Sequence, residues 1–280
     1  MRKPLVLGLL VAAVAVVGAA PAGAVVGGTK ADQPYPFMVS LQNPQAPGGK
    51  HFCGASVLAP RWLLTAAHCV DNAGNVAKTT VRVGSDRSDA GGRIVKLEKV
   101  VLHPDYIRNG PAGAHADIAL VHLVDPVDLP AIPVAATPGE GSAVRAIGWG
   151  RTCAKETEVN CPLPSPSLKQ LEMKVVEPKS CDRMSTGDTC LNSVEAGGAV
   201  CFADSGSPLL VKAGTGWRIA GVASRFGAPD GTDSCDSPTS IYTDAHAVRD
   251  WIATTAGMPV QRSTRSGFGN GSEALSPRYR

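Results

Sequence analysis

Short apolar runs separated by turn-forming clusters constrain the fold of this chain more than any other feature. Clusters such as Pro47-Gly48-Gly49 and Ala228-Pro229-Asp230-Gly231 punctuate the sequence, and glycine (31) with proline (22) supplies about one of every five of its 280 residues. Many short strands between such turns are typical of an all-β barrel or sandwich. The predicted strands are Phe37–Leu41, Ala55–Leu58, Thr79–Val83, Arg93–Val101, Ile118–Leu123, Ala143–Ile147, Leu168–Val176, Pro208–Val211, Trp217–Ala223 and Thr239–Thr243.

Three segments depart from this strand pattern. The Pro- and Ala-rich stretch Asp125–Gly141 predicts a linker between two halves of the chain. A helix is predicted near the end, with Asp244 as its N-cap, an apolar face that includes Trp251, and Gly257 as its stop. Residues 258–280 contain mostly Gly, Ser and Arg with few apolar side chains, which predicts a disordered tail.

The N-terminus has the parts of a secretory signal peptide. Arg2 and Lys3 precede the apolar run Leu5–Ala20, and the small residues Ala22-Gly23-Ala24 follow it. The alternative is a membrane anchor, but the run of about 16 residues is shorter than the ~20 that a membrane-spanning helix needs. We therefore expect residues 1–24 to be removed, with the mature chain secreted and extracellular and no membrane contact remaining.

The predicted export determines the expected oxidation state of the eight cysteines. Export places the chain in an oxidising compartment, so four disulfides are expected. Eight cysteines allow 105 pairings, and their spacing alone leaves all of these open.

The net charge of +3 does not indicate a nucleic-acid partner. Arg2 and Lys3 leave with the predicted signal peptide, and residues 258–280 carry a further +3. Residues 25–252 therefore have a net charge of −2, and they contain no run of lysine and arginine.

Three short motifs carry candidate chemistry, in the order His, Asp, Ser. They are Thr65-Ala66-Ala67-His68-Cys69, Asp117-Ile118-Ala119-Leu120 and Asp204-Ser205-Gly206-Ser207-Pro208. With Val25-Val26-Gly27-Gly28 and Gly148-Trp149-Gly150, they resemble the signatures of the chymotrypsin–trypsin family of serine endopeptidases. The resemblance runs from Val25 to about Gly257.

The resemblance implies a fold and an activity. The expected fold is all-β, with two six-stranded antiparallel Greek-key barrels, at about residues 25–131 and 132–257, and a C-terminal helix. The expected activity is hydrolysis of peptide bonds through an acyl-enzyme. Ser205 would be the nucleophile, His68 the general base and acid, and Asp117 the carboxylate that orients the imidazole.

Other histidines do not lie in a matching motif. We expect them to be surface or packing residues, His115 being the nearest to a motif; they are His51, His103, His115, His122 and His246. The sequence has no HExxH or CxxC motif that would indicate zinc. The family's calcium loop corresponds to the short stretch Gly84–Asp89, which lacks its acidic pattern, so neither a metal nor another cofactor is expected.

The resemblance assigns the oxyanion hole to the backbone N–H groups of Ala203 and Ser205. The family usually has glycine at the position of Ala203, and at Ser207 glycine is also commoner. Ala203 keeps the N–H donor, but a positive φ there would cost about 1–2 kcal/mol of strain.

The predicted specificity pocket lacks a carboxylate. Its floor would be Ala199, and Ser240 would narrow it where a wide pocket has glycine. Burying an unpaired lysine or arginine side chain there would be very costly. We therefore expect a small or medium apolar residue before the scissile bond.

The wall of that pocket leaves two alternatives open. Ser224, Phe226 and Gly227 belong to a stretch that replaces the family's Ser-Trp-Gly, and a shift of one residue changes the alignment. Phe226 then either takes the place of the tryptophan or blocks the pocket entrance.

Activation in this family pairs a new N-terminal amine with a buried aspartate, here Val25 with Asp204. Ala22-Gly23-Ala24 directly precedes Val25. Either signal peptidase itself creates the mature end, or a very short propeptide remains to be removed.

The resemblance also implies the disulfides Cys53–Cys69, Cys181–Cys190 and Cys201–Cys235. Cys153 and Cys161 then remain as an additional pair, which we expect to stiffen its loop against self-cleavage.

The expected partners are protein or peptide substrates and protein inhibitors of a monomeric enzyme. The same motifs leave two other functions open. One is a catalytically weak or inactive homologue that binds proteins, and the other is an esterase for non-peptide substrates.

Overall fold

The computed structural model describes residues 25–45, 51–110, 113–154, 161, 163–228 and 234–259. The predicted signal peptide, residues 1–24, and residues 260–280 of the predicted tail lie outside these ranges. Within them, no helix has both the length and the apolar character needed to cross a membrane.

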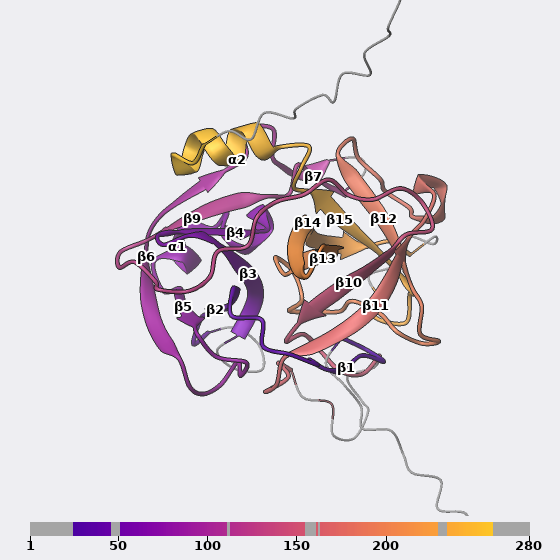
Figure 1. The fold of residues 1–280 in the computed structure, drawn as a ribbon, viewed down its shortest axis with the longest axis horizontal. Coiled ribbons are helices and arrows are strands. Elements are labelled where there is room, and N and C mark those ends of the chain that lie inside the picture. Colours follow the sequence, from indigo (N-terminus) through magenta and orange to yellow (C-terminus); the bar gives the residue numbers. More distant parts are fainter. Residues whose placement is uncertain are drawn as a thin grey trace, which may run out of the picture.

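The first half of the chain forms a closed six-stranded antiparallel barrel (Figure 1). Its strand order is β2-β3-β4-β9-β6-β5. Inward-facing apolar residues such as Leu41, Leu63 and Leu120 are fully buried and form its core. The strands are β2 (Met38–Gln42), β3 (His51–Ala59), β4 (Trp62–Thr65), β5 (Thr80–Val83), β6 (Arg93–Leu102) and β9 (Ala119–Leu123).

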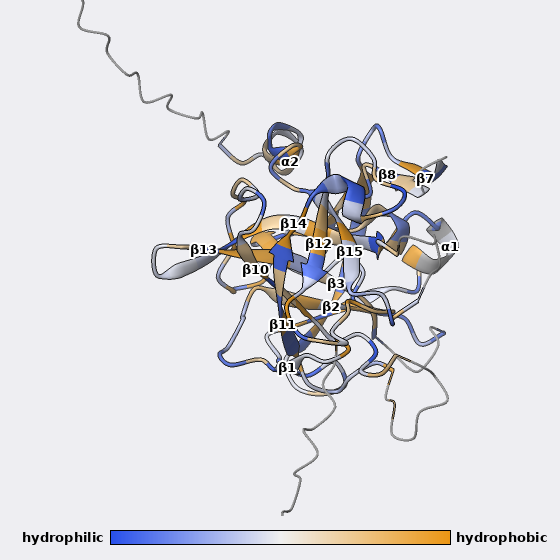
Figure 2. Cartoon of the chain, turned by 90° about the vertical axis from the view of Figure 1, so that its right-hand side faces the viewer, coloured by the Kyte–Doolittle hydropathy of each residue, from blue (hydrophilic) through white to orange (hydrophobic). Residues whose placement is uncertain are grey.

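The second half forms another six-stranded barrel, whose order is β11-β10-β13-β14-β15-β12, closed by the pairing of β11 with β12. A short strand, β1 (Thr29–Lys30), pairs with β11 on the outside. Figure 2 shows apolar residues concentrated on β10, β13 and β14. The strands are β10 (Ala143–Gly148), β11 (Lys169–Val175), β12 (Asp188–Ser193), β13 (Pro208–Ala213), β14 (Gly216–Phe226) and β15 (Thr239–Asp244).

The remaining elements are short. They comprise the hairpin β7 (Ile107–Gly110) and β8 (Gly113–His115), the helix α1 (Ala73–Val76), the C-terminal helix α2 (Arg249–Ala256), and the 3-10 helices η1 (Ala67–Cys69) and η2 (Pro178–Ser180). Helix α2 follows the second barrel in sequence but covers the first, where Ile252 joins the core (Figure 1).

The predicted N-cap of the helix is wrong. Helix α2 has Val248 at its N-cap, with no side-chain hydrogen bond. Asp244 instead ends β15, and its Oδ1 accepts the N–H groups of His246 and Ala247 in the turn before the helix. Gly257 ends the helix as predicted, in the left-handed conformation with φ of 65°.

The all-β fold with two six-stranded barrels is confirmed, and each of the ten predicted runs overlaps a strand. Five strands were missed, namely β1, β4, β7, β8 and β12. Of these, β7 and β8 pair only with each other, and β12 (Asp-Thr-Cys-Leu-Asn-Ser) carries little apolar character. The hairpin strands are too short for a clear local pattern, and the position of β12 depends on its pairing with β11 and β15.

The eight cysteines form four disulfides, which are the three pairs that the resemblance implies and the additional pair Cys153–Cys161. They are Cys53–Cys69, Cys153–Cys161, Cys181–Cys190 and Cys201–Cys235. The first of these joins β3 to η1 and so fixes the segment that carries His68.

Candidate active site at the junction of the two barrels

The loop before β13 reaches from the second barrel to β3 of the first. The N–H of Gly54 donates to the carbonyl oxygen of Ser205, with 2.7 Å between the two atoms. A side chain at Gly54 would collide with Ser207, and one at Gly206 (φ of 81°) would collide with the carbonyl oxygen of Gly54. The two glycines therefore permit the close approach that places Ser205 at the junction.

His68 and Asp117 are in direct contact within the first barrel. Nδ1 of His68 lies 2.7 Å from Oδ2 of Asp117, and the backbone N–H of His68 donates to Oδ1 at 2.9 Å. A carboxylate that is ionised can only accept, so Nδ1 carries the hydrogen and Nε2 keeps a free lone pair. This tautomer can accept a proton at Nε2.

Asp117 is completely buried but remains the charged partner. Burial by itself would raise the pKa of Asp117, but the charge interaction with His68 and the hydrogen bonds from His68 and Ser224 together lower it below its ordinary value. The Ser224 hydroxyl donates to Oδ2 over 2.7 Å. Sequence reasoning placed Ser224 only in the pocket wall and missed this contact.

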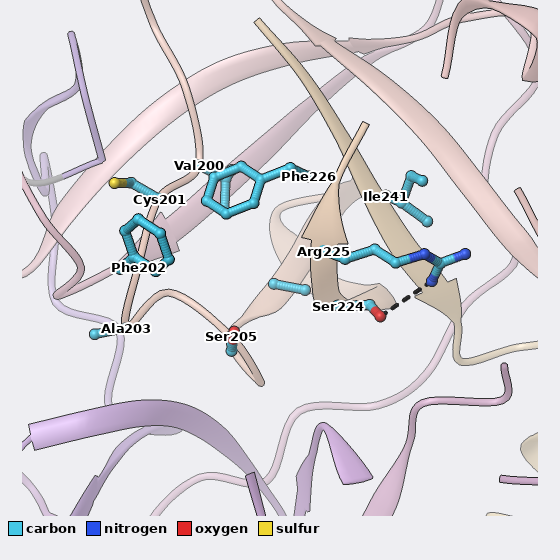
Figure 3. A pocket seen from close by; sticks show the side chains of 10 residues that line it. Val200, Cys201, Phe202, Ala203, Ser205, Ser224, Arg225, Phe226 and Ile241 are labelled. Atoms are coloured by element: carbon cyan, nitrogen blue, oxygen red, sulfur yellow. Dashed lines mark hydrogen bonds between the residues drawn. The ribbon is translucent and has the colours of Figure 1, made fainter. Parts of the chain in front are cut away.

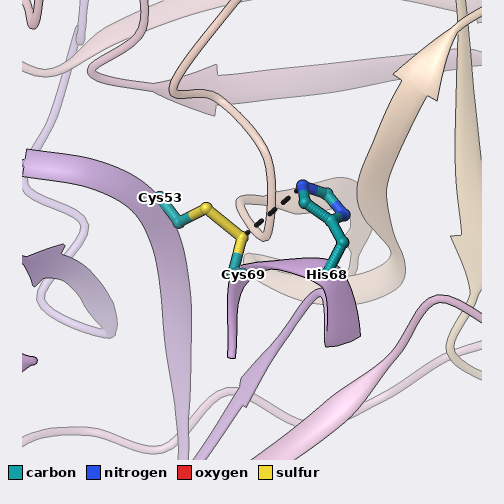
Figure 4. Close-up of side chains that lie close together, drawn as sticks. All are labelled: Cys53, His68 and Cys69. Carbon is teal, nitrogen blue, oxygen red and sulfur yellow. Dashed lines mark hydrogen bonds between the residues drawn. A yellow bond between two sulfur atoms is a disulfide. The ribbon is translucent and has the colours of Figure 1, made fainter. Parts of the chain in front are cut away.

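The other ring nitrogen of His68 faces the Cys53–Cys69 disulfide (Figure 4). Nε2 lies 3.7 Å from Sγ of Cys69, and in the described part of the chain no hydrogen bond joins Nε2 to Oγ of Ser205. The two sulfurs and His68 are close enough to suggest a metal site, but disulfide sulfurs are not thiolate ligands. Hydrogen bonds between nucleophile and base commonly tighten only when substrate binds.

The backbone at Ala203 has the positive φ that the sequence analysis considered. Its φ is 71°, a conformation that costs an alanine about 1–2 kcal/mol. The carbonyl oxygen of Ala203 lies 3.1 Å from Nε2 of His51, and Nδ1 of that ring lies 2.7 Å from Oγ of Ser40. Because a carbonyl only accepts, Nε2 of His51 carries the hydrogen and the Ser40 hydroxyl donates to Nδ1.

His51 is a functional neighbour that sequence reasoning missed. It is buried, and this burial lowers its pKa to about 4, although the hydrogen bond to Ala203 acts in the opposite direction. The imidazole is therefore neutral at ordinary pH. No motif surrounds His51, and its nearness to Ala203, 152 residues away, is visible only in the tertiary structure.

A pocket opens beside Ser205 (Figure 3). Among the predicted pocket residues, Ser224 and Phe226 line it, whereas Ala199, Gly227 and Ser240 are buried outside the lining. The full lining is Val200, Cys201, Phe202, Ala203, Ser205, Ala223, Ser224, Arg225, Phe226 and Ile241.

Phe226 and its neighbour Arg225 point in opposite directions (Figure 3). The Phe226 ring meets that of Phe202 edge to face, with 5.3 Å between centroids, and it packs against the buried cluster that contains Ala199. Phe202 also contacts the guanidinium of Arg151, whose Cζ lies 4.8 Å from the ring centroid. Phe226 therefore contributes an aromatic ring to the lining of the pocket.

Asp204, directly before Ser205, is buried beneath the pocket. Its carboxylate accepts the N–H groups of Gly150 (2.8 Å) and Cys201 (3.0 Å). Burial raises its pKa to about 7, although these two hydrogen bonds act in the opposite direction. Val25 is also buried, in the core of the second barrel. A buried aspartate of this kind favours a nearby positive charge.

Comparisons with known proteins identify the family of the chain. A family model described as Trypsin matches residues 24–252. A tryptase from Mus musculus and trypsin 5G1 from Aedes aegypti are each 32% identical over 253 residues, which is 81% and 84% of this chain and 87% and 86% of theirs. The structure of neuropsin, described as a serine protease expressed in mouse brain, matches with a TM-score of 0.67 at 25% identity, covering 83% of this chain and 100% of that one.

Proposed function

The chain belongs to the trypsin family of serine peptidases, and from this premise we propose that it is a secreted endopeptidase in which Ser205, His68 and Asp117 carry the reaction. The observation that carries the proposal is the contact of 2.7 Å between His68 Nδ1 and Asp117, which leaves Nε2 as the basic nitrogen. The Gly54 hydrogen bond supports the role of Ser205 by bringing its loop against the first barrel.

In the proposed reaction, Ser205 Oγ attacks the scissile carbonyl and passes its proton to Nε2 of His68. The N–H groups of Ala203 and Ser205 stabilise the oxyanion of the tetrahedral intermediate. When the C–N bond breaks, His68 returns the proton to the leaving amine and an acyl-enzyme remains. Water then attacks the ester, His68 again moves the proton, and the acid product leaves with Ser205 regenerated.

The proposed substrate has a small or medium apolar residue before the scissile bond. Two features of the pocket support this preference. The described residues that line it include no carboxylate to pair with a buried lysine or arginine. The Phe226 ring, which also belongs to the lining, reduces the space left for a substrate side chain.

We propose activation through the amine of Val25, released when residues 1–24 are removed. Its charge would offset that of Asp204, whose pKa is raised by burial while its described hydrogen-bond partners are two neutral N–H groups. N-terminal sequencing of the secreted protein tests this step. A mature end at Val25 is expected, and an end at Pro21 or earlier would mean that a second cleavage is needed.

Two measurements test the function itself. A fluorophosphonate probe should label the processed protein at Ser205 and fail to label the matched variant S205A. Cleavage of a peptide library derived from a proteome should then show small or medium apolar residues before the cut. Absence of labelling would favour the alternative of an inactive, protein-binding homologue, and a profile dominated by lysine or arginine would refute the proposed preference.

A further inference from the structure

Arg225, next to Ser224 in β14, has its guanidinium enclosed by other parts of the second barrel and by the β7–β8 hairpin. One nitrogen, Nη1, lies 3.2 Å from Oγ of Ser224. The other, Nη2, donates to the carbonyl oxygen of Arg183 over 2.7 Å and pairs with the carboxylate of Asp188. A side chain at Gly113 of β8 would press on Arg225, so the hairpin covers this face.

The chemistry of these groups fixes where their hydrogens point. A guanidinium can only donate, so Ser224 Oγ accepts from Arg225. The single hydroxyl hydrogen of Ser224 is then free for Oδ2 of Asp117, 2.7 Å away. Asp117 in turn accepts from Nδ1 of His68. The donor and the acceptor of each hydrogen bond are therefore defined. Arg225 donates to Ser224, Ser224 donates to Asp117, and Nδ1 of His68 donates to the same carboxylate.

Asp188 keeps the guanidinium in place. Its side chain is 1% exposed, and its Oδ2 also accepts the backbone N–H of Ser185 at 2.8 Å. Burial raises the pKa of Asp188, whereas the charge of Arg225 and the hydrogen bonds from Arg225 and Ser185 act in the opposite direction. A planar fork that reaches three acceptors in fixed directions is specific to arginine, because a lysine carries its three donors on one compact ammonium.

We propose that Arg225 is a positioning residue for catalysis, which acts on His68 through Ser224 and Asp117. This inference rests on the proposed peptidase function. Arg225 is 10% exposed at its side chain and points away from Phe226 (Figure 3), and although it is among the residues that line the pocket, its guanidinium is held by Ser224, Arg183 and Asp188.

Several titratable groups surround this hydrogen-bonded chain. Asp188 of β12 faces Arg225, and His115 of β8 acts electrostatically on Asp188. The charge of Asp117 acts electrostatically on Tyr106, and the Tyr106 hydroxyl donates to Asp71. None of these groups takes the place of Ser224 as the hydroxyl that donates to Asp117 in the described structure.

The test is a double-mutant cycle between Arg225 and Ser224, using the processed enzyme and a short peptide ester. R225M should lower kcat/KM by about tenfold, the value of one hydrogen bond to a charged network. In the S224A background, which lacks the hydroxyl between Arg225 and Asp117, R225M should lower kcat/KM by less than about threefold. R225M should also move the acidic limb of the pH profile to higher pH, because a positive charge near His68 is lost. R218M, on the same strand, is the matched control and should leave both readouts unchanged.

A loss from R225M of the same size in both backgrounds, or no loss in either, would overturn the inference. If R225M leaves Asp188 unpaired and fails to fold, R225M/D188N removes both charges and serves in its place. The proton resonance of His68 Nδ1–H gives a readout independent of turnover and should shift in R225M and in S224A alike. Fluorophosphonate labelling of Ser205 tests the peptidase function separately from the role of Arg225. If Ser205 is labelled but R225M and S224A show no coupling, only the role of Arg225 is rejected.

Discussion

Nε2 of His51 lies 3.1 Å from the carbonyl oxygen of Ala203 and donates its hydrogen to it. This contact joins the start of β3 in the first barrel to Ala203 in the second, the residue whose N–H is proposed for the oxyanion hole. The hydrogen bond fixes the carbonyl oxygen of Ala203, and the strained φ of 71° sets the direction of the N–H of the same residue. A buried imidazole thus supports a backbone conformation that an alanine adopts only at a cost.

His51 should make the folded protein sensitive to mild acid. Its pKa is about 4 in the folded state and near 6.5 when exposed, so the unfolded chain binds more protons between these values. Stability is therefore complete above pH 6.5 and falls as the pH drops towards 4, by on the order of 3 kcal/mol. Urea unfolding of S205A that has been cleaved at Val25, so that the new amine offsets the charge of Asp204, measures this loss between pH 7 and pH 4.5.

The matched variant for that measurement is H51Q in the S205A background, because glutamine does not titrate. It should lose less stability between the two pH values than its parent. Equal losses in parent and variant would show that other groups cause the acid sensitivity.

Replacing Ala203 by glycine should relieve strain. A203G removes a positive φ at a residue with a Cβ, so we expect a gain of about 1 kcal/mol in the free energy of unfolding and a rise in kcat/KM of up to about tenfold. The methyl group should also crowd protein inhibitors, so A203G should bind them more tightly. Unchanged rates and unchanged inhibitor affinities would contradict this account.

The control for Ala203 is A213G at the exposed end of β13, where φ is not positive. There the same substitution should lower stability by about 0.5–1 kcal/mol, because glycine loses more backbone entropy on folding.

Phe226 should limit the size of the residue that precedes the scissile bond. F226G removes the ring that packs against Phe202 and the Ala199 cluster. We expect kcat/KM for substrates with a large aromatic residue at that position to rise by about 10–100-fold, with little change for alanine substrates. F226L, which keeps most of the bulk, should retain the original profile. A preference unchanged in F226G would show that Phe226 does not define the pocket.

Asp204 should make the stability of the uncleaved chain depend on pH in a way that the cleaved chain does not show. With the bond before Val25 intact, the folded-state pKa of about 7 exceeds the unfolded value of 3.8, so the native state binds more protons between them. Stability is then fully present below pH 3.8 and is lost as the pH rises to 7, by on the order of 4 kcal/mol. Cleavage supplies an amine charge that should abolish this loss.

Thermal unfolding of S205A from pH 4 to pH 7, before and after cleavage at Val25, measures the difference. D204N provides the control, since an amide does not titrate and its uncleaved form should lack this fall in Tm. A fall of the same size in D204N would assign the effect to other groups.

Local sequence pattern predicted most of the fold. The strand-length runs and turn clusters identified ten strands, because a half-buried strand carries its signal in its own side chains. The strands β7 and β8 were missed because they are only four and three residues long, and β12 was missed because it carries little apolar character and pairs with β11 and β15. The prediction of Asp244 as the helix cap was wrong, because an aspartate side chain accepts backbone N–H groups in a turn as readily as at the start of a helix.

By itself, the sequence determined the family motifs, and with them the expected His68, Asp117 and Ser205 and the expected disulfide pairs. Only the tertiary structure decided which way Phe226 and Arg225 point, since a shift of one residue in a bulged strand exchanges the faces of its side chains. The partnership of His51 with Ala203 likewise required both barrels in place. Hydrogen-bond direction and burial are properties of assembled neighbours, so residues outside any motif acquire these roles only when the chain has folded.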